Sequence, residues 1–227
     1  MKTARLIFED GKVFFGKVFA NGKDCNGELV FNTAMSGYQE VLTDPSYCGQ
    51  IVMMTYPLIG NYGINEEDIE SDKLHLKAFV VREYLDFPSN WRSTKSLKEY
   101  LEEHNILGIE GLDTRAITRY VREKGSQKVM VTASSKPLDE LLSELATFPG
   151  MLGQNLAKEV TCSKPYKWNS DNKEKKYKVA VIDCGVKYNI LRQLNDNGCE
   201  CHVFPITITA KEILEQKYDG VFVSNGP

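Results

Sequence analysis

The sequence predicts an α/β protein in two parts, an N-terminal part that mixes strands and helices and a C-terminal part built on a parallel sheet. In the first part, short apolar runs end in loops rich in Gly, Pro, Ser and Asn, which is typical of buried strands joined by structured loops. In the second part, strands and helices alternate strictly, as in a parallel sheet with helical crossovers. The 227 residues have room for one large domain or two ordinary ones.

The composition excludes several classes of partner. Apolar residues make up 42% of the chain and charged residues 26%, and 28 basic residues stand against 31 acidic ones, for a net charge of -3. A nucleic-acid or anionic-membrane partner normally demands a basic face, so neither is expected. No apolar run approaches the roughly 18 residues that span a bilayer, and the N-terminus leads into a strand instead of a signal-peptide core. We therefore expect a cytoplasmic protein.

The six cysteines predict no metal site and no redox centre. They form no CxxC pair, and the three histidines are scattered along the chain. Cys184 is interpreted as a small buried residue, because no histidine stands at a spacing that suggests a catalytic partner. We expect Cys199 and Cys201 to face opposite sides of a strand, and reduced thiols fit a cytosolic protein.

The first predicted elements are strands. Residues 5 to 19 alternate around Asp10-Gly11, a pair that favours a two-residue hairpin turn because both positions tolerate positive φ. Two apolar runs, Leu29 to Phe31 and Ile51 to Met54, are predicted as buried strands. Between them, Asp44-Pro45-Ser46 is a predicted turn, since proline presets its own dihedral and the flanking side chains can bond back to the backbone.

The middle of the chain continues with a loop, a strand and a helix. We expect a charged surface loop from Asn65 to Lys73 and then a buried strand from Leu76 to Val81. A helix near Ser96 to His104 is indicated by the capping-box spacing of Ser96 and Glu99.

A second helix is marked at both ends. Asp113 can cap its free amides, the helix runs to about Lys124, and Gly125 supplies the stop. Val129 to Ala133 is a predicted strand, and Pro137 suits the first turn of a leucine-rich helix that closes the first part.

The second part begins after a polar linker. Pro149-Gly150 breaks the preceding helix, and the stretch from Thr161 to Lys176 has the composition of an exposed linker. A parallel sheet binds ligands beyond the carboxyl ends of its strands, so the loops Asp183 to Gly185 and Ser224 to Pro227 should border a small-molecule site. No glycine-rich nucleotide-binding motif accompanies Gly185. The predicted strands and helices are, in order, Lys178 to Ile182, Tyr188 to Asn195, Cys199 to Phe204, Ala210 to Lys217 (opened by a Thr209 and Glu212 capping box), and Gly220 to Ser224.

Several motifs resemble one family. Three stretches are similar, in register, to the signature of the small, glutamine-using subunit of carbamoyl-phosphate synthase. They are Gly37 to Glu40, Thr43 to Tyr47 and Tyr56 to Gly63. The resemblance covers nearly the whole chain. Further matching stretches are Gly111 to Arg115, Arg122 to Gly125, Phe148 to Gly150, Asn155 to Val160, Asp183 to Ile190 and Val223 to Pro227.

The resemblance implies a fold and a division into domains. Residues 1–150 would form the N-terminal domain of the small subunit, a mixed domain of the swivelling β/β/α type. Residues 151–176 would be a linker, and residues 177–227 would be the start of a flavodoxin-like class I glutamine amidotransferase domain.

The resemblance also implies an activity. In that family the small subunit hydrolyses glutamine with a Cys-His pair assisted by Glu, and ammonia passes through a tunnel to the large subunit. The large subunit uses bicarbonate and ATP with Mg to make carbamoyl phosphate for arginine and pyrimidines. L-glutamine and the large subunit are therefore the expected partners, in a heterodimer, and no cofactor or metal is expected in this chain.

Two family residues map onto this sequence, Ser46 and Gly226, both as glutamine contacts. The nucleophilic cysteine of the family lies downstream of a Gly-Pro-Gly-Asp-Pro motif, and its His and Glu lie further on. These catalytic residues would fall after Pro227, so no catalytic residue is assigned. We expect the 227 residues to be part of a longer enzyme and to be inactive alone. The alternatives are a docking module that only binds the large subunit and, less well matched to residues 28 to 63, a stand-alone flavodoxin-like regulatory protein.

Overall fold

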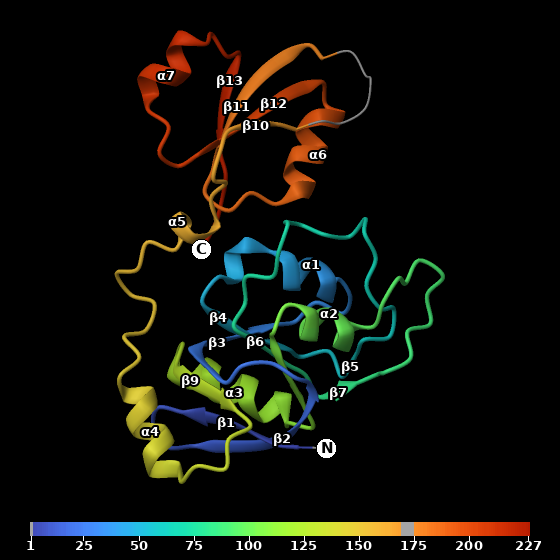
Figure 1. Cartoon of the computed structure of the whole chain (residues 1–227), viewed down its shortest axis with the longest axis vertical. Helices are drawn as coiled ribbons and strands as arrows, with labels where there is room; N and C mark the ends of the chain where they lie inside the picture. Colours follow the sequence, from blue (N-terminus) through green and yellow to red (C-terminus); the bar gives the residue numbers. More distant parts are fainter. Residues whose placement is uncertain (1, 169–174) are drawn as a thin grey trace. The chain divides into compact units, whose positions relative to one another are not determined.

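The computed structural model describes residues 2–168 and 175–227, and the chain folds into two compact units (Figure 1). Two short segments from the first half of the chain belong to the second unit. No local sequence pattern predicts this assignment. The predicted boundaries at residues 150 and 176 stay predictions. The N-terminal unit comprises the residues up to Leu42, Gly49–Ile69 and Leu76–Gln154, and the C-terminal unit comprises Thr43–Cys48, Glu70–His75 and Asn155–Pro227.

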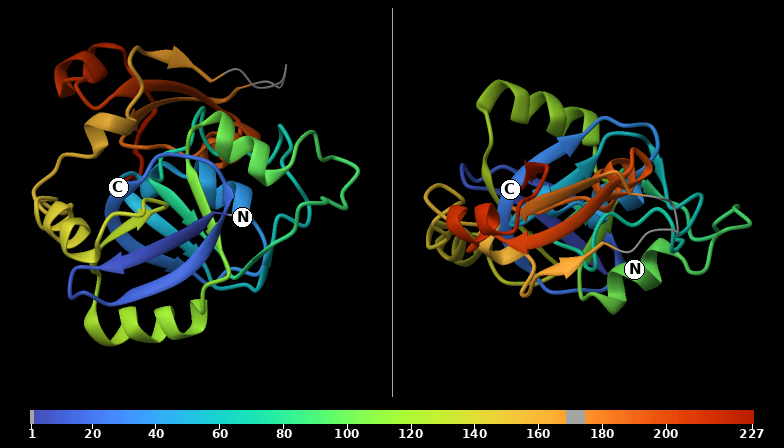
Figure 2. Two further views of the ribbon diagram at one scale, coloured as in Figure 1. Left: turned by 60° about the horizontal axis from the view of Figure 1, so that its bottom comes forward. Right: turned by 90° about the horizontal axis from the view of Figure 1, so that it is seen from above.

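The N-terminal unit is built on a closed barrel (Figure 2). The order of its strands is β1-β2-β8-β6-β4-β3-β9. Strands β3, β4, β6 and β8 pair in parallel, while the β1–β2 hairpin and β9 close the barrel with antiparallel pairs. Closure leaves this sheet without an open edge. The strands are β1 Thr3–Phe8, β2 Val13–Ala20, β3 Cys25–Asn32, β4 Gln50–Met54, β6 Ala78–Val80, β8 Leu107–Glu110 and β9 Lys128–Thr132, and a separate pair joins β5 Leu58–Ile59 to β7 Glu83–Tyr84.

The barrel interior is filled by alternate residues of these strands, as the period-two pattern requires. Leu6, Leu29, Ile51, Met53 and Ile109 are each at most 1% exposed and belong to one apolar cluster. The strands predicted around Leu29, Ile51 and Leu76 are therefore confirmed, with slightly different ends.

The β1–β2 hairpin is confirmed, but its turn differs from the predicted one. Gly11 has φ of 87°, whereas Asp10 does not adopt positive φ. The Gly11 amide donates to Phe8 O at 2.9 Å and the Phe8 amide donates to Lys12 O at 2.8 Å. A longer turn with a single left-handed glycine thus replaces the expected two-residue turn.

The helices of the first half confirm the predicted caps. Ser96 and Glu99 form the reciprocal capping box of α2. The Asp113 carboxylate accepts from the Ala116 amide at the start of α3, and Gly125 follows the helix with φ of 84°. The helices are α1 Tyr38–Thr43, the 3-10 turn η1 Pro45–Tyr47, α2 Leu97–Glu103, α3 Thr114–Lys124 and α4 Leu138–Ala146.

The C-terminal unit contains a four-stranded sheet in the order β10-β12-β11-β13. Strand β11 pairs in parallel with both β12 and β13, so the predicted parallel winding is confirmed. The Thr209 and Glu212 capping box at the start of α7 is also present. The elements are α5 Ala157–Val160, β10 Tyr166–Lys167, β11 Tyr177–Asp183, α6 Tyr188–Asp196, β12 Cys199–Pro205, α7 Ala210–Glu215 and β13 Gly220–Val223.

Two predicted loops are more ordered than their composition suggests. The expected linker from Thr161 to Lys176 contributes β10, which pairs antiparallel with β12, while residues 169–174 of that prediction lie outside the described residues. In the expected surface loop from Asn65 to Lys73, Asn65, Glu70 and Ser71 are at most 8% exposed. These polar residues can be buried because each forms a hydrogen bond within the fold.

The expectation that Cys199 and Cys201 face opposite sides of a strand is wrong. Residues two apart on a strand share a face, and both side chains pack against the same apolar cluster as Val181 and Leu191. Within the described residues, no helix is long and apolar enough to cross a membrane.

Candidate functional site at the carboxyl edge of the parallel sheet

The loops that follow β11 and β13 touch each other at the carboxyl edge of the sheet. The Cys184 amide donates to Ser224 Oγ at 2.9 Å, and the Ser224 amide donates to Ile182 O at 3.0 Å. A Cβ atom added to Gly226 would lie 1.7 Å from the carbonyl oxygen of Cys184. The two loops predicted to border a site are therefore neighbours, and Gly226 permits their close approach.

Asp183 organises the first of these loops. The residue is 4% exposed, and its Oδ1 accepts from the amides of Gly185 at 2.9 Å and Val186 at 2.8 Å. Oδ2 accepts from the Cys162 amide at 2.7 Å. One carboxylate thus folds the turn between β11 and α6 and attaches it to the segment that precedes β10.

The turn that carries Ser46 lies against the same loop of the C-terminal unit. Asp44 Oδ1 accepts from the Ser46 amide at 2.9 Å, which confirms the predicted turn. A Cβ atom built on Gly185 would lie 3.1 Å from Pro45 Cβ and 3.2 Å from Gly226 Cα. Gly185 therefore lies close to both the Ser46 turn and Gly226, and even a methyl side chain there would crowd both.

Two polar groups at this edge are available to a ligand. Among residues 2–168 and 175–227, neither the Ser46 hydroxyl nor the Gly226 amide has a hydrogen-bonding partner. Beside them, the Lys187 ammonium lies 3.4 Å from the Asp44 carboxylate. The structure brings together the segments of the two predicted glutamine contacts, whose role as contacts stays a prediction.

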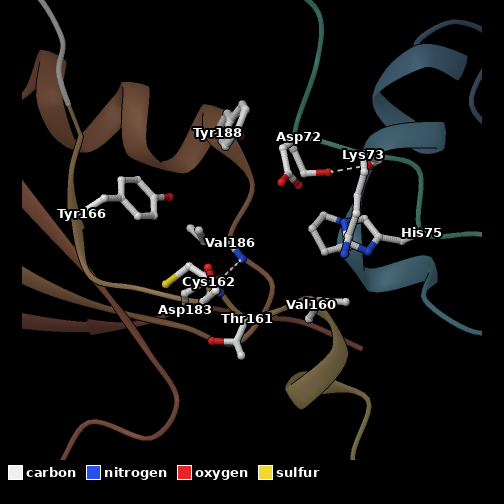
Figure 3. Close-up of a pocket in the computed structure, with 13 residues that line it drawn as sticks. Asp72, Lys73, His75, Val160, Thr161, Cys162, Tyr166, Asp183, Val186 and Tyr188 are labelled. Atoms are coloured by element: carbon white, nitrogen blue, oxygen red, sulfur yellow. Dashed lines mark hydrogen bonds between the residues drawn. The ribbon is translucent and has the colours of Figure 1, made fainter.

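A pocket of about 240 Å³ adjoins this loop within the C-terminal unit (Figure 3). Its wall combines Asp72 and His75 from the first half of the chain with Cys162, Tyr166 and Tyr188 from the second. Burial, and then the nearby Asp183 carboxylate, raise the pKa of the Cys162 thiol to about 12, so this thiol is protonated at neutral pH and a poor nucleophile. Of its walls, only the Asp183 loop was expected from the sequence, because the other lining residues are far apart along the chain.

Protonation of His75 should weaken this unit. Burial and then Lys73 lower the pKa of His75, while Asp72, Asp44 and Asp183 act in the opposite direction. The unfolded chain then binds the proton more tightly, so the free energy of unfolding should fall as pH drops through the ordinary histidine value of 6.5. Urea denaturation at about pH 7.5 and about pH 5.5 should show a larger loss for the wild type than for His75→Gln. Equal losses in the two proteins would contradict this prediction.

Cys184 also has the properties of a structural thiol. It is half-buried, and burial followed by the Asp183 carboxylate raises its pKa. A raised pKa keeps the thiol protonated, which supports a structural role over a catalytic one, although the residue is half-buried and not fully buried as predicted. In the part of the chain that the structure describes, no group of three or more His, Cys, Asp or Glu side chains is placed to hold a metal ion.

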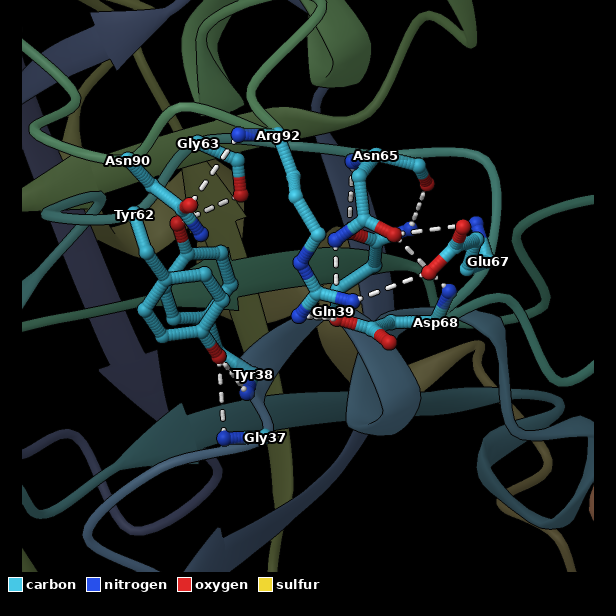
Figure 4. Close-up of polar contacts among 10 residues, drawn as sticks. All are labelled: Gly37, Tyr38, Gln39, Tyr62, Gly63, Asn65, Glu67, Asp68, Asn90 and Arg92. Atoms are coloured by element: carbon cyan, nitrogen blue, oxygen red, sulfur yellow. Dashed lines mark hydrogen bonds and ion pairs between the residues drawn. The ribbon is translucent and has the colours of Figure 1, made fainter.

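The signature residues at 37–39 and 62–63 form a cluster with Asn65 in the N-terminal unit (Figure 4). The Tyr62 hydroxyl oxygen accepts from the amides of Gly37 at 2.9 Å and Tyr38 at 2.7 Å, and the Tyr38 hydroxyl donates to Gly63 O at 2.7 Å. The two tyrosine rings stack with centroids 4.0 Å apart. These motif residues therefore fix the start of α1, the helix that leads into the Ser46 turn.

The fold and this edge define a protein with a barrel unit and a parallel α/β unit, in which a small ligand is expected at the strand ends. Residues 6–131 match the family model described as carbamoyl-phosphate synthase small chain, CPSase domain, and residues 180–227 match glutamine amidotransferase class-I. The chain belongs to the family of carbamoyl-phosphate synthase small chains.

Curated relatives named carbamoyl phosphate synthase small chain support this assignment. The protein of Syntrophotalea carbinolica is 47% identical and aligns with 99% of this chain and 62% of its own length. That of Aquifex aeolicus is 48% identical, with 100% and 64% covered, and that of Clostridium perfringens is 46% identical, with 99% and 62% covered. The chain thus spans less than two thirds of the length of these relatives. An aminopeptidase structure from Aneurinibacillus aligns with a TM-score of 0.34 at 12% identity, covering 98% of this chain and 56% of its own, a likeness too low to indicate a shared fold.

Proposed function

We propose that the chain acts within a glutamine-hydrolysing small subunit of carbamoyl-phosphate synthase. This subunit hydrolyses glutamine to glutamate and supplies ammonia to a large subunit, which makes carbamoyl phosphate from bicarbonate and ATP. One observation carries the proposal. Gly185 lies close to both the Ser46 turn and Gly226, and the Ser46 hydroxyl and Gly226 amide have no partner among the described residues.

Each of these groups suits one part of an amide substrate. The Gly226 amide can donate to a carbonyl oxygen and would stabilise the oxyanion that develops when a nucleophile attacks that carbonyl. The Ser46 hydroxyl can donate and accept, as the amino and carboxylate groups of an amino acid require. The family's Cys-His-Glu set is assigned to no residue here, and the raised pKa values of Cys162 and Cys184 argue against either as the nucleophile.

The finer features of the family are part of the same proposal. The N-terminal barrel would be the swivelling domain, and the C-terminal sheet would belong to a flavodoxin-like amidotransferase domain. ATP and Mg would bind to the large subunit of a heterodimer, with no cofactor in this chain. Cytoplasmic location is supported by the six free cysteines. The product would serve arginine or pyrimidine synthesis.

The test is ammonia transfer in the protein purified from its natural host, assayed with the synthetase subunit. Glutamine should support carbamoyl phosphate formation, with ammonium chloride as the control nitrogen source that bypasses the small subunit. The isolated 227-residue chain should release no ammonia from glutamine. If ammonium supports synthesis but glutamine does not, although the two subunits bind each other, the docking alternative is correct.

A further inference from the structure

The first turn of α6 is capped by a residue from a distant segment of the C-terminal unit, Glu70. Within the described part of the chain, the N-cap residue Lys187 makes no side-chain capping hydrogen bond. Instead, Glu70 O accepts from the Tyr188 amide at 2.9 Å, and Glu70 Oε2 accepts from the Asn189 amide at 2.9 Å. Glu70 is 8% exposed, and its carboxylate lies at the positive end of the helix dipole.

Glu70 also holds the segment that leads into the Ser46 turn. The Glu70 amide donates to Thr43 Oγ1 at 2.9 Å, and the neighbouring Ser71 hydroxyl donates to Thr43 O at 2.5 Å. Thr43 is fully buried and directly precedes the turn. The side chain and the backbone of Thr43 are therefore both held by residues 70 and 71.

These contacts join the two sides of the proposed glutamine site. Helix α6 begins three residues after Gly185, and Thr43 lies three residues before Ser46. Glu70 contacts both the helix and the threonine, so it sets the separation between the Ser46 turn and the Gly185 loop. We propose that Glu70 is a positioning residue for glutamine binding, an inference that rests on the proposed function.

The chemistry of the contacts predicts which substitutions matter. In Glu70→Ala, the half-buried hydrogen bond between the Asn189 amide and the carboxylate is lost, and a small cavity replaces the buried Glu70 side chain. Both changes favour a shift of the helix start or of the segment that contains Glu70. In Glu70→Gln, the side-chain oxygen still accepts from Asn189, although the negative charge at the helix start is lost. A displacement of about 1 Å at a binding site can cost about 100-fold, so a small shift of the Ser46 turn would be measurable.

The experiment measures glutamine-dependent and ammonium-dependent carbamoyl phosphate synthesis by the enzyme purified with its synthetase subunit. Glu70→Ala should raise the glutamine KM by about 10- to 100-fold while ammonium-dependent activity stays unchanged. Glu70→Gln should restore a KM within about threefold of the wild type. Glu66→Ala is the matched control, because Glu66 is an exposed carboxylate in the same loop.

The outcomes separate the inference from the proposed function. If the wild type uses ammonium but not glutamine, the proposed function fails. If the wild type uses glutamine and Glu70→Ala keeps its glutamine KM, the positioning role is wrong. If Glu70→Ala loses glutamine-dependent and ammonium-dependent activity together, or if Glu70→Gln is as impaired as Glu70→Ala, the residue has a general structural role, and the inference is likewise overturned.

Discussion

A Gly226→Ala variant is expected to raise the glutamine KM of the assembled enzyme by about 100-fold or more. The added methyl carbon would lie 1.7 Å from the carbonyl oxygen of Cys184, a backbone atom that cannot rotate away. The chain after β13 would have to move by more than an ångström. Because the Gly226 amide is the proposed donor to the substrate carbonyl, that movement would misplace it.

The matched control for this variant is Gly220→Ala, at the start of β13, the strand that precedes Gly226. Among the described residues, no heavy atom lies within 4 Å of a Cβ built on Gly220, and its φ is outside the left-handed region. This control should keep the wild-type KM. Steady-state kinetics with glutamine and with ammonium as nitrogen source measure both variants. If Gly226→Ala keeps the wild-type glutamine KM, as Gly220→Ala should, the close approach of Gly226 to Cys184 does not matter for glutamine binding.

The second large effect is expected at Asp183. Asp183→Ala should lower the free energy of unfolding of the C-terminal unit by about 3–5 kcal/mol, because it leaves three buried or half-buried backbone amides without their acceptor. The amides belong to Gly185, Val186 and Cys162. Urea denaturation followed by circular dichroism measures the change.

Asp183→Asn separates loss of acceptors from loss of packing. Its amide oxygen can still accept from Gly185 and Val186, but its NH2 group cannot accept from Cys162. The expected loss is about 1–3 kcal/mol, intermediate between the wild type and the alanine variant. An alanine variant within about 1 kcal/mol of the wild type would mean that water replaces the carboxylate as acceptor.

The sequence predicted those elements whose signals are local. The capping boxes that begin at Ser96 and Thr209, and the cap at Asp113, were correct because each involves residues three apart on one helix. The turn at Asp10-Gly11 was predicted as a hairpin but with the wrong turn, since the dipeptide permits positive φ at both positions without requiring it.

The candidate site was predicted less completely. The prediction that the strand-end loops border a site rests on the general behaviour of parallel sheets, which bind ligands at the carboxyl ends of their strands. The prediction that Ser46 and Gly226 contact glutamine rests on the family resemblance. Composition alone predicts a surface loop around Glu70, because the contacts that order this segment, such as the hydrogen bond from the Asn189 amide, come from residues up to 119 positions away along the chain. Tyr166 was assigned to a linker for a similar reason, as its strand partner is Val203.

The threading of Thr43–Cys48 and Glu70–His75 into the C-terminal unit has an evolutionary consequence. If the C-terminal unit were one continuous module, a single crossover in the linker between the units could exchange it between two small chains. A crossover near residue 160 in this chain would give α6 a foreign capping loop and would place a foreign Ser46 turn against Gly185. Functional chimeras of small chains should therefore inherit these two short segments together with the C-terminal unit, and the segments should co-vary with α6 across the family.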